Sequence, residues 1–497
     1  MLGRAERHIG SRETERSGPT QREQPSFQEE ALSPRVGVEP RGAARERSVE
    51  VARTEELVHE AQGTDLLERA LERGNMQRAL RRVERNRGAP GVDGMEVGQL
   101  RAYLQVHWPE IREQLLAGTY RPQPVRRVEI PKPDGKVREL GIPTVVDRLI
   151  QQALLEVLTP IFDPRFSDAS YGFRPGRSAH QAVKRAQSYV AEGYGWVVDL
   201  DLEKFFDRVN HDMLMARVAR TVTDKRVLKL IRAYLNAGVL ANGVVVANEE
   251  GAPQGGPLSP LLANILLDDL DKELEKRGHR FVRYADDCTV YVKSERAGQR
   301  VLESVTGYLE KRLKLKVNRE KTAVARPRER QILGFRLFRD GQGLRIGLAP
   351  KSVKRVKAVI RQLTRASRGG WSMEERIRRL RLRLQGWVRY FALADTGSVF
   401  EALDEWLRRR LRMVYWKQWK RPRTRKRNLR ALGMPDWMGR LVVSRKGPWR
   451  NAGSPPMQAV LNNHYWLDHG LLGLGGYYRD LRNEWRTAGY GPVRPVV

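Results

Sequence analysis

Residues 281–292 read FVRYADDCTVYV, and this stretch decides the fold of the chain. Two runs rich in β-branched and aromatic residues flank a short polar pair, which is typical of a β-hairpin. The pattern therefore predicts a hairpin that carries Asp286 and Asp287 on its turn. Adjacent carboxylates repel each other, and folds retain such a pair mainly where a divalent cation neutralises it. An Asp-Asp dipeptide by itself is more often a solvated turn, so the metal interpretation needs another carboxylate from a different strand.

Residues 196–207, WVVDLDLEKFFD, supply that carboxylate. Strand alternation places Val198 on one face and Asp199 and Asp201 on the other, so an apolar face packs on helices while acids gather at the strand end. Beside the hairpin, Asp201 and Asp286 could hold two Mg²⁺ ions about 3.5–4 Å apart, the arrangement that serves in-line phosphoryl transfer. One ion would activate a primer 3′-hydroxyl, and the other would hold the triphosphate and the leaving pyrophosphate.

The composition indicates a polyanionic partner. The chain has 497 residues, a formal net charge of +33 and a pI near 10.6, and such a charge requires either a bound polyanion or severe self-repulsion. Aromatic residues scattered among the arginine clusters favour single-stranded or structured RNA. The one cysteine, Cys288, excludes disulfides and an all-cysteine zinc site and is expected to be a core thiol. No apolar run reaches about 18 residues, so we expect a cytoplasmic protein with no membrane segment.

The hairpin with Asp201 resembles the palm of a reverse transcriptase. Residues 251–265, GAPQGGPLSPLLANI, resemble the group II intron branch of that family in particular. The resemblance runs from about Leu66 to near the C-terminus, with several motifs in the family's order. It implies an α/β (α+β) right-hand polymerase, with fingers and palm built on antiparallel sheet and an α-helical thumb, called domain X, behind them. The resemblance also implies that Asp201 and Asp286 are metal ligands and that Asp287 completes the acidic turn.

A basic hairpin is predicted in residues 128–143, which have the pattern of strand, Pro-Asp-Gly turn and strand. In the family this is the fingertip hairpin over the incoming nucleotide, and Lys132 and Arg138 match the positions that bind its triphosphate. Cations on a mobile hairpin can close on phosphates and exclude water. A generic basic hairpin is the other interpretation.

Three further residues match family positions in the nucleotide pocket. Phe206 corresponds to a steric gate that blocks the ribose 2′-hydroxyl, whereas its neighbour Phe205 is expected to fill the core. Gln254 and Gly255 line the pocket, where a glycine allows close backbone approach.

Basic and aromatic residues elsewhere indicate RNA contacts. Residues 166–178, FSDASYGFRPGRS, resemble template-holding blocks of the family, and stacking by Tyr171 or Phe173 and burial of these rings both remain open. Residues 377–391 carry an apolar stripe at three- and four-residue steps and many arginines, and GWVRYF at 386–391 resembles the maturase-specific domain X that grips intron RNA. The residues so implied are Arg174, Trp387, Arg389, Tyr390, Arg408 and Trp416.

The resemblance implies an RNA-directed DNA polymerase that copies group II intron RNA into cDNA for retrohoming and assists splicing as a maturase. Its partners would be intron RNA, a DNA target or primer, and dNTPs in the bacterial cytoplasm or nucleoid; a homodimer stays open. Another bacterial reverse transcriptase (retron, diversity-generating or defence-associated) and a splicing-only maturase are the alternatives, and a metal-dependent nuclease is a third. With one cysteine in the palm, we expect no His-Asn-His endonuclease domain, so priming would use an existing nick or nascent strand. The expected domains are 1–60, a disordered extension; 61–190, fingers with an N-terminal extension; 191–345, palm; 346–432, thumb or domain X; and 433–497, a basic DNA-binding-like tail.

Overall fold

The computed structural model describes residues 65–131, 137–241, 244–246, 251, 255–365, 370–442 and 447–487. The expectation for residues 1–60 therefore lies outside the described part of the chain. Among the described helices, none combines the length and the apolar character that a membrane-spanning segment needs.

The first part of the described chain is mainly helical, with one four-stranded sheet. The apolar pattern from Leu66 forms two helices rather than one, because the backbone of Glu72 is extended, with ψ 140°. The predicted strand–turn–strand of residues 128–143 is confirmed as two antiparallel strands, although its turn lies outside the described residues. The helices are α2 (Leu66–Leu71), α3 (Arg73–Asn86), α4 (Leu100–Leu116), α5 (Val145–Phe162), α6 (Ala179–Ala191), α7 (His211–Ala219) and α8 (Lys225–Asn236). The strands are β1 (Val125–Pro131), β2 (Val137–Ile142), β4 (Val239–Ala241) and β5 (Val244–Val246), which form one sheet in the order β2-β1-β4-β5.

A second four-stranded sheet carries the predicted acidic residues. Its order is β6-β7-β3-β8, and all its neighbouring strands are antiparallel. The predicted hairpin is confirmed as the β6–β7 pair, and the predicted acidic strand as β3 between β7 and β8. The strands are β3 (Trp196–Leu200), β6 (Arg280–Tyr284), β7 (Asp287–Val292) and β8 (Ala323–Ala325).

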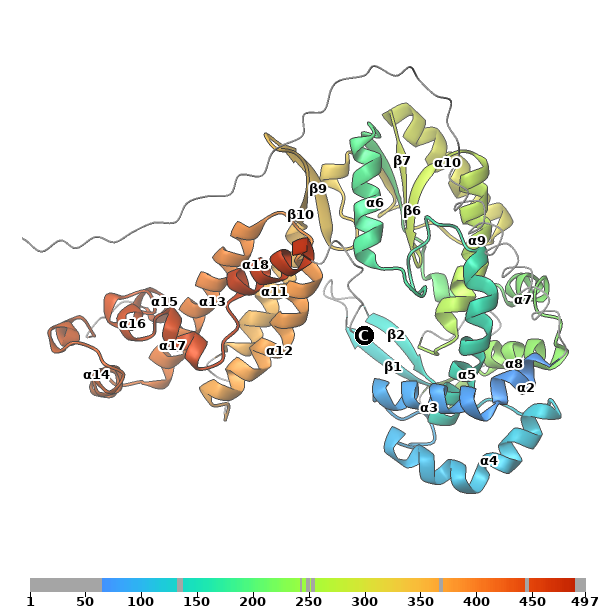
Figure 1. The fold of residues 1–497 in the computed structure, drawn as a ribbon, viewed down its shortest axis with the longest axis horizontal. Helices are drawn as coiled ribbons and strands as arrows, with labels where there is room; N and C mark the ends of the chain where they lie inside the picture. Colours follow the sequence, from blue (N-terminus) through green and yellow to red (C-terminus); the bar gives the residue numbers. More distant parts are fainter. Residues whose placement is uncertain are drawn as a thin grey trace, which may run out of the picture. The chain divides into compact units, whose positions relative to one another are not determined.

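The two faces of this sheet belong to different hydrophobic cores. Val198 and Leu200 pack with residues of α9 (Ser259–Lys276) and α10 (Glu295–Arg312), whereas Val197 packs with residues of α6. This alternation confirms the predicted strand pattern, and Figure 1 shows α6 on one side of the sheet and α9 and α10 on the other. Acids on a strand buried on both faces can reach solvent only at its end, which fixes where a polar site can form.

The rest of the chain is a hairpin followed by helices. The apolar stripe predicted in residues 377–391 is confirmed, since α12 buries Ile377, Leu380 and Leu384 along one side. The described residues after the sheet form β9 (Phe335–Asp340), β10 (Gly343–Leu348), α11 (Pro350–Leu363), α12 (Met373–Phe391), α13 (Gly397–Gln418), α14 (Pro422–Ala431), α15 (Pro448–Asn451), α16 (Pro455–Val460), α17 (Asn463–Asp468) and α18 (Leu474–Thr487).

Candidate active site

The acidic hairpin has a two-residue loop. Tyr284 and Asp287 are paired across the β6–β7 ladder, so Ala285 and Asp286 alone form the turn. Ala285 has a φ of 57°, and a positive φ at the first loop residue is the feature of a type II′ hairpin turn. Asp286 therefore lies at the tip, while Asp287 is the first residue of β7 rather than part of the loop.

The register of β3 and β7 brings the acids of the two segments to the same end of the sheet. Asp199 pairs with Thr289 and Leu200 with Cys288, so Asp201 follows at the level of Asp287. The backbone of Asp201 is held on both sides, because its N–H donates to Thr322 Oγ1 at 3.1 Å and its carbonyl accepts from the Asn318 N–H at 2.8 Å. The predicted approach of this acid to the hairpin is thus a property of the strand register.

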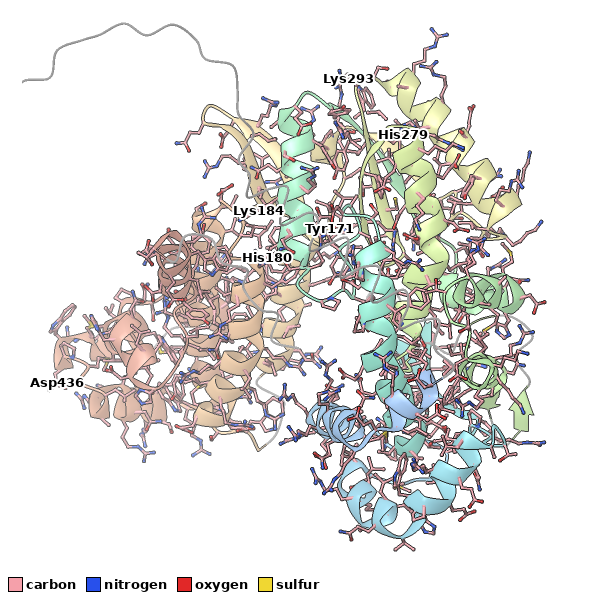
Figure 2. The ribbon with its side chains drawn as sticks, turned by 45° about the vertical axis from the view of Figure 1, so that its right-hand side comes forward. Tyr171, His180, Lys184, His279, Lys293 and Asp436 are labelled. Atoms are coloured by element: carbon pink, nitrogen blue, oxygen red, sulfur yellow. The ribbon has the colours of Figure 1, made fainter. Side chains whose placement is uncertain are left out.

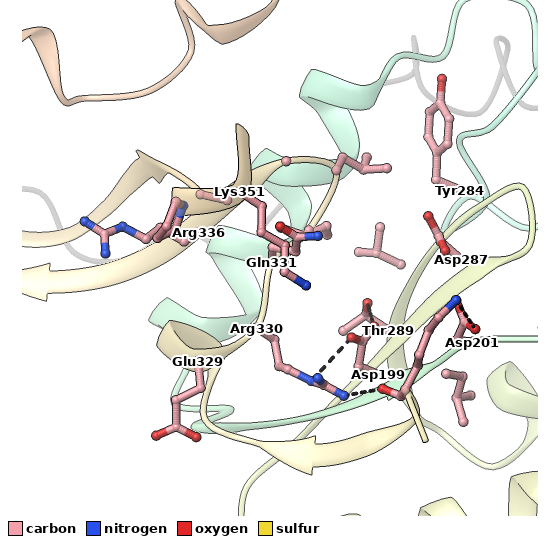
Figure 3. A pocket seen from close by; sticks show the side chains of 18 of the residues that line it. Asp199, Asp201, Tyr284, Asp287, Thr289, Glu329, Arg330, Gln331, Arg336 and Lys351 are labelled. Atoms are coloured by element: carbon pink, nitrogen blue, oxygen red, sulfur yellow. Dashed lines mark hydrogen bonds and ion pairs between the residues drawn. The ribbon is translucent and has the colours of Figure 1, made fainter. Parts of the chain in front are cut away.

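Asp199, Asp201 and Asp287 line a cleft of about 810 Å³, which also contains several cations. Lys321 Nζ lies 3.2 Å from Asp201 Oδ2, and Arg330 Nε lies 3.4 Å from Asp199 Oδ2. Figure 3 shows Asp199, Asp201 and Asp287 along the same part of the cleft, with Arg330 directed at Asp199. The basic residues that complete the lining are Arg328, Arg336, Lys351 and Arg355.

Sequence reasoning missed Lys321 and Arg330 as partners of the acids. Residues 319–330 contain several cations, but their spacing alone does not show which of them reach the cleft. The available signal was the acidic cluster itself, because adjacent carboxylates require neutralising charge nearby.

The electrostatics of the cleft fit a cation-binding role. The pKa of Asp287 is raised to about 6, first by desolvation and then by the carboxylates of Asp286, Asp199 and Asp201. Part of the residue is nevertheless exposed to the cleft. Desolvation also raises the pKa of Asp199, and Arg330 opposes that shift. Lys321 and Arg330 thus neutralise only part of the clustered charge, and carboxylate oxygens are the ligands that Mg²⁺ prefers.

Within the described residues, no three His, Cys, Asp or Glu side chains converge as a ready-made metal site. The ion pair between Lys321 and Asp201 gives a reason, since Asp201 would have to turn from the ammonium toward the hairpin to share a cation with Asp286. The carboxylates of Asp201, Asp286 and Asp287 are suitable ligands for a divalent cation. In this structure, however, protein cations neutralise part of the charge of the cleft.

The predicted nucleotide pocket is described only in part. Lys132 and Gln254 lie outside the described residues, and Arg138 belongs to β2 with only its backbone described. Gly255 has a φ of 137°, and a Cβ built there would stand 2.4 Å from the carbonyl oxygen of Gly141 in β2. This glycine therefore lets its segment approach β2 closely, and its place in the nucleotide pocket stays a prediction.

The neighbouring residues Phe205 and Phe206 differ in burial, and the expectation for Phe205 is confirmed. Phe205 is 3% exposed and fills the core, as predicted. Phe206 is half-buried and meets the Phe205 ring edge to face, with 5.1 Å between the centroids. A partly open Phe206 close to the end of β3 is compatible with the steric-gate expectation, which stays a prediction.

The residues expected to contact RNA have different surroundings. Arg174 is buried, and its guanidinium donates to Asp163 Oδ1 at 2.7 Å and to the carbonyls of Ser167 and Ser170. Trp416 is 3% exposed, with the Arg425 guanidinium 4.1 Å from its ring centroid. Both side chains are thus structural in this geometry, because their partners are internal.

The remaining RNA candidates lie nearer the surface. Trp387 is partly buried against Phe391 and Phe400, and Arg408 pairs with Asp404 at 2.9 Å. Tyr390 and Arg389 keep exposed surface. The candidates that can meet a ligand directly are Arg389 and Tyr390.

Tyr390 also connects α12 to two earlier segments. Its carbonyl oxygen lies 2.6 Å from Nε2 of His180 on α6, and its hydroxyl donates to the Leu333 carbonyl at 2.9 Å. Figure 2 labels His180 and Lys184, one turn apart on α6.

Stacking and burial were both open for two aromatic rings in residues 166–178. Tyr171 is buried, whereas Phe173 is 60% exposed.

The fold and site are those of a polymerase palm: an antiparallel sheet with acids at the end of one strand and on the adjoining hairpin. Comparison with known families agrees, since residues 130–337 match the reverse transcriptase (RNA-dependent DNA polymerase) model. Residues 353–433 match the group II intron maturase-specific domain. The chain belongs to the reverse transcriptase family, in the branch that carries this maturase domain.

Individual relatives support the assignment. Protein YkfC of Escherichia coli K12 is 37% identical over 289 residues, covering 50% of this chain and 76% of that protein. The group II intron-encoded protein LtrA of Lactococcus lactis subsp. cremoris is 32% identical over 310 residues, covering 49% of this chain and 52% of LtrA. This chain therefore matches only about half the length of LtrA. Among solved structures, a partial Cas6-RT-Cas1–Cas2 complex is 29% identical over 49% of this chain and 42% of that one, with a TM-score of 0.33 that does not establish a shared fold.

Proposed function

We propose that this protein is an RNA-directed DNA polymerase that copies group II intron RNA into cDNA and also assists splicing of that RNA. The observation that carries the proposal is that Asp201 and Asp287 line a cleft rimmed by cations at one end of the β3–β7 pair, with Asp286 next to Asp287 at the tip of the hairpin turn. Reverse transcriptase domains use divalent metal ions, and the matched maturase domain adds a connection to intron RNA.

In this proposal Asp201, Asp286 and Asp287 hold two Mg²⁺ ions. When bound, these cations would neutralise the charge of the primer 3′-oxygen and of the leaving pyrophosphate. The protein positions the carboxylates: the strand register sets the position of Asp201 along the sheet, and the two-residue turn sets the position of Asp286. Lys321 and Arg330 offset enough of the acidic charge for the cleft to fold and then face the incoming phosphates.

The nucleotide pocket of the proposal comprises the residues that match the family's positions. A deoxynucleotide would lie between the β1–β2 hairpin and the end of β3, with its ribose against Phe206. Gly255 admits β2 close to the pocket, as its contact with Gly141 indicates. The proposed pocket residues are Lys132, Arg138, Phe206, Gln254 and Gly255.

Intron RNA would bind the basic C-terminal helices, including Arg389 and Tyr390 on α12. Helix α14 carries further exposed arginines, which we assign to the same role. Splicing itself would be RNA chemistry, and the protein would contribute binding energy to the folded ribozyme. We place this activity in the bacterial cytoplasm, with a DNA target or nascent strand supplying the primer.

The test is primer extension on an RNA template with dNTPs and Mg²⁺, comparing the wild-type protein with Asp286→Ala. We expect templated cDNA from the wild type and none from the variant. Asp212→Ala is the matched control, because its side chain is 83% exposed and pairs only with a surface arginine, Arg232, in the structure. It should extend primers like the wild type. If neither the wild type nor Asp286→Ala extends a primer, yet both promote splicing of the intron RNA, the protein is a maturase without polymerase activity.

A further inference from the structure

A fully buried ion pair lies directly beneath the acidic turn. Arg283 on β6 and Asp271 on α9 are both 0% exposed, and the guanidinium donates from Nε at 2.7 Å and from Nη2 at 2.6 Å to the two carboxylate oxygens. A buried pair of this kind is weak evidence for stability, since well-packed apolar residues of similar volume often serve as well. A positional role is the alternative reason for such a pair.

The third nitrogen of the same guanidinium reaches the turn itself. Arg283 Nη1 donates to the Ala285 carbonyl at 2.9 Å and to Asn264 Oδ1 at 2.9 Å, and Asn264 Nδ2 donates to the Gly172 carbonyl at 2.9 Å. Asn264 is 1% exposed, so these bonds are shielded from water. One planar guanidinium, fixed by Asp271, therefore connects α9, the turn and the loop at Gly172.

The turn needs external support, because its backbone is in an unfavourable conformation. Ala285 has a positive φ, which glycine adopts freely but alanine does not. The loop at Gly172 presses on the same turn, since a Cβ built on Gly172 would stand 2.3 Å from the Ala285 nitrogen. Backbone bonds from the Tyr171 N–H to the Arg283 carbonyl and from the Arg283 N–H to the Ala169 carbonyl, both 2.9 Å, hold that loop along β6.

We propose that Asn264, Arg283 and Asp271 are positioning residues that hold the Ala285–Asp286 turn in place and so set the separation of Asp286 from Asp201. This inference rests on the proposed polymerase function. It deepens that function by assigning a role to three side chains that do not themselves line the acidic cleft. Displacing a reacting group by about 1 Å lowers turnover by about 100-fold, so the network affects the chemical step more than substrate binding.

The experiment replaces Asn264 with leucine, a residue of similar shape that makes no hydrogen bonds. Asn75→Leu is the matched control, because Asn75 is also 1% exposed and its amide donates to main-chain carbonyls, those of Ala70 and Ala153, that do not belong to the turn. For Asn264→Leu we expect kcat per folded molecule to fall about 10- to 100-fold and the Mg²⁺ concentration for half-maximal rate to rise, as for residues that orient metal ligands. The KM for dNTP and the Kd for primer–template should stay close to those of the wild type.

A second measurement does not depend on polymerase activity. Amide hydrogen exchange should become faster in the peptide that spans residues 283–288 for Asn264→Leu and stay unchanged there for Asn75→Leu. If the wild type extends no primer, the proposed function fails, while faster exchange would still support the positional role. Unchanged exchange at the turn, or activity losses that follow the folded fraction equally in both variants, would overturn the inference.

Arg283→Lys covers the case in which Asn264→Leu does not fold. Lysine keeps the charge opposite Asp271 but cannot serve the carboxylate, Asn264 and the Ala285 carbonyl at once. We expect a folded protein with the same raised Mg²⁺ requirement and faster exchange at residues 283–288. A folded Arg283→Lys protein with wild-type values of both would refute the positional role.

Discussion

Gly172→Ala should disable the chemical step while leaving most of the fold intact. The added Cβ would stand 2.3 Å from the nitrogen of Ala285 and 2.9 Å from the carbonyl carbon of Tyr284, whereas ordinary van der Waals contact begins at 3.4 Å. The obstacles are main-chain atoms on the turn, so no side chain can rotate to relieve the overlap. The loop at residue 172 and the turn must separate by about 1 Å, and Asp286 moves with the turn.

A displacement of about 1 Å costs about 100-fold in turnover, which corresponds to about 2.7 kcal/mol of transition-state stabilisation. The assay is single-nucleotide primer extension under saturating dNTP, with the thermal midpoint measured in parallel. The control is Gly298→Ala, whose Cβ would stand 2.5 Å from a methyl group of Val324, a side chain that can move. This control should lose stability but keep its turnover per folded molecule. A Gly172→Ala protein that extends primers within about threefold of the wild type would show that the turn does not set the position of Asp286.

Three other outcomes follow from the structure. Gly255→Ala places a methyl group against a β2 carbonyl at a φ of 137°, so the KM for dNTP should rise about 10-fold or more with little change in RNA affinity. Arg423 and Arg427 are exposed on α14. Replacing both with glutamine should lower the slope of log binding constant against log salt concentration by about 0.7–0.9 for each phosphate that the protein no longer neutralises. Arg174→Gln should leave that slope unchanged and reduce the thermal midpoint. Burial raises the pKa of Asp147 from 3.8 to about 6, so the folded state binds this proton more tightly than the unfolded state. The free energy of unfolding of the wild type should therefore fall by up to about 3 kcal/mol, relative to Asp147→Asn, as pH rises from 4 to 6.5. Urea titrations across this pH range measure that difference.

Local sequence patterns predicted the parts of the fold that depend on periodicity and turn chemistry. The β6–β7 hairpin, the alternation of Val197 and Val198 and the apolar stripe of α12 all follow from spacing alone, because each buries one face of a regular element. The proximity of Asp201 to the hairpin required the family's arrangement of strands. Strand order is a long-range property, and no local pattern contains it.

The predicted site was less complete where burial of charged residues decides the outcome. The sequence pattern does not distinguish the arginines of α12 from one another, but Arg376 is 1% exposed and donates to the carbonyls of Leu363 and Arg365. Arg283 likewise sits in a strand whose sequence is typical of ordinary β-structure. A buried arginine has to find its acid or carbonyl partners elsewhere in the chain, and the sequence around it does not name them.

Internal ion pairs also reduce the number of cations that the net charge of +33 leaves available to RNA phosphates. Arg378 and Arg379 on α12 both pair with Glu375, whose carboxylate they hold at a pKa of about 2. These two guanidiniums must therefore exchange one shared acid for phosphate, and they gain less on binding than arginines without such a partner. Arginines with internal partners contribute nothing to counterion release, because they neutralise no phosphate. The salt slope should thus report a subset of the exposed cations and not the total number of basic residues in the C-terminal helices.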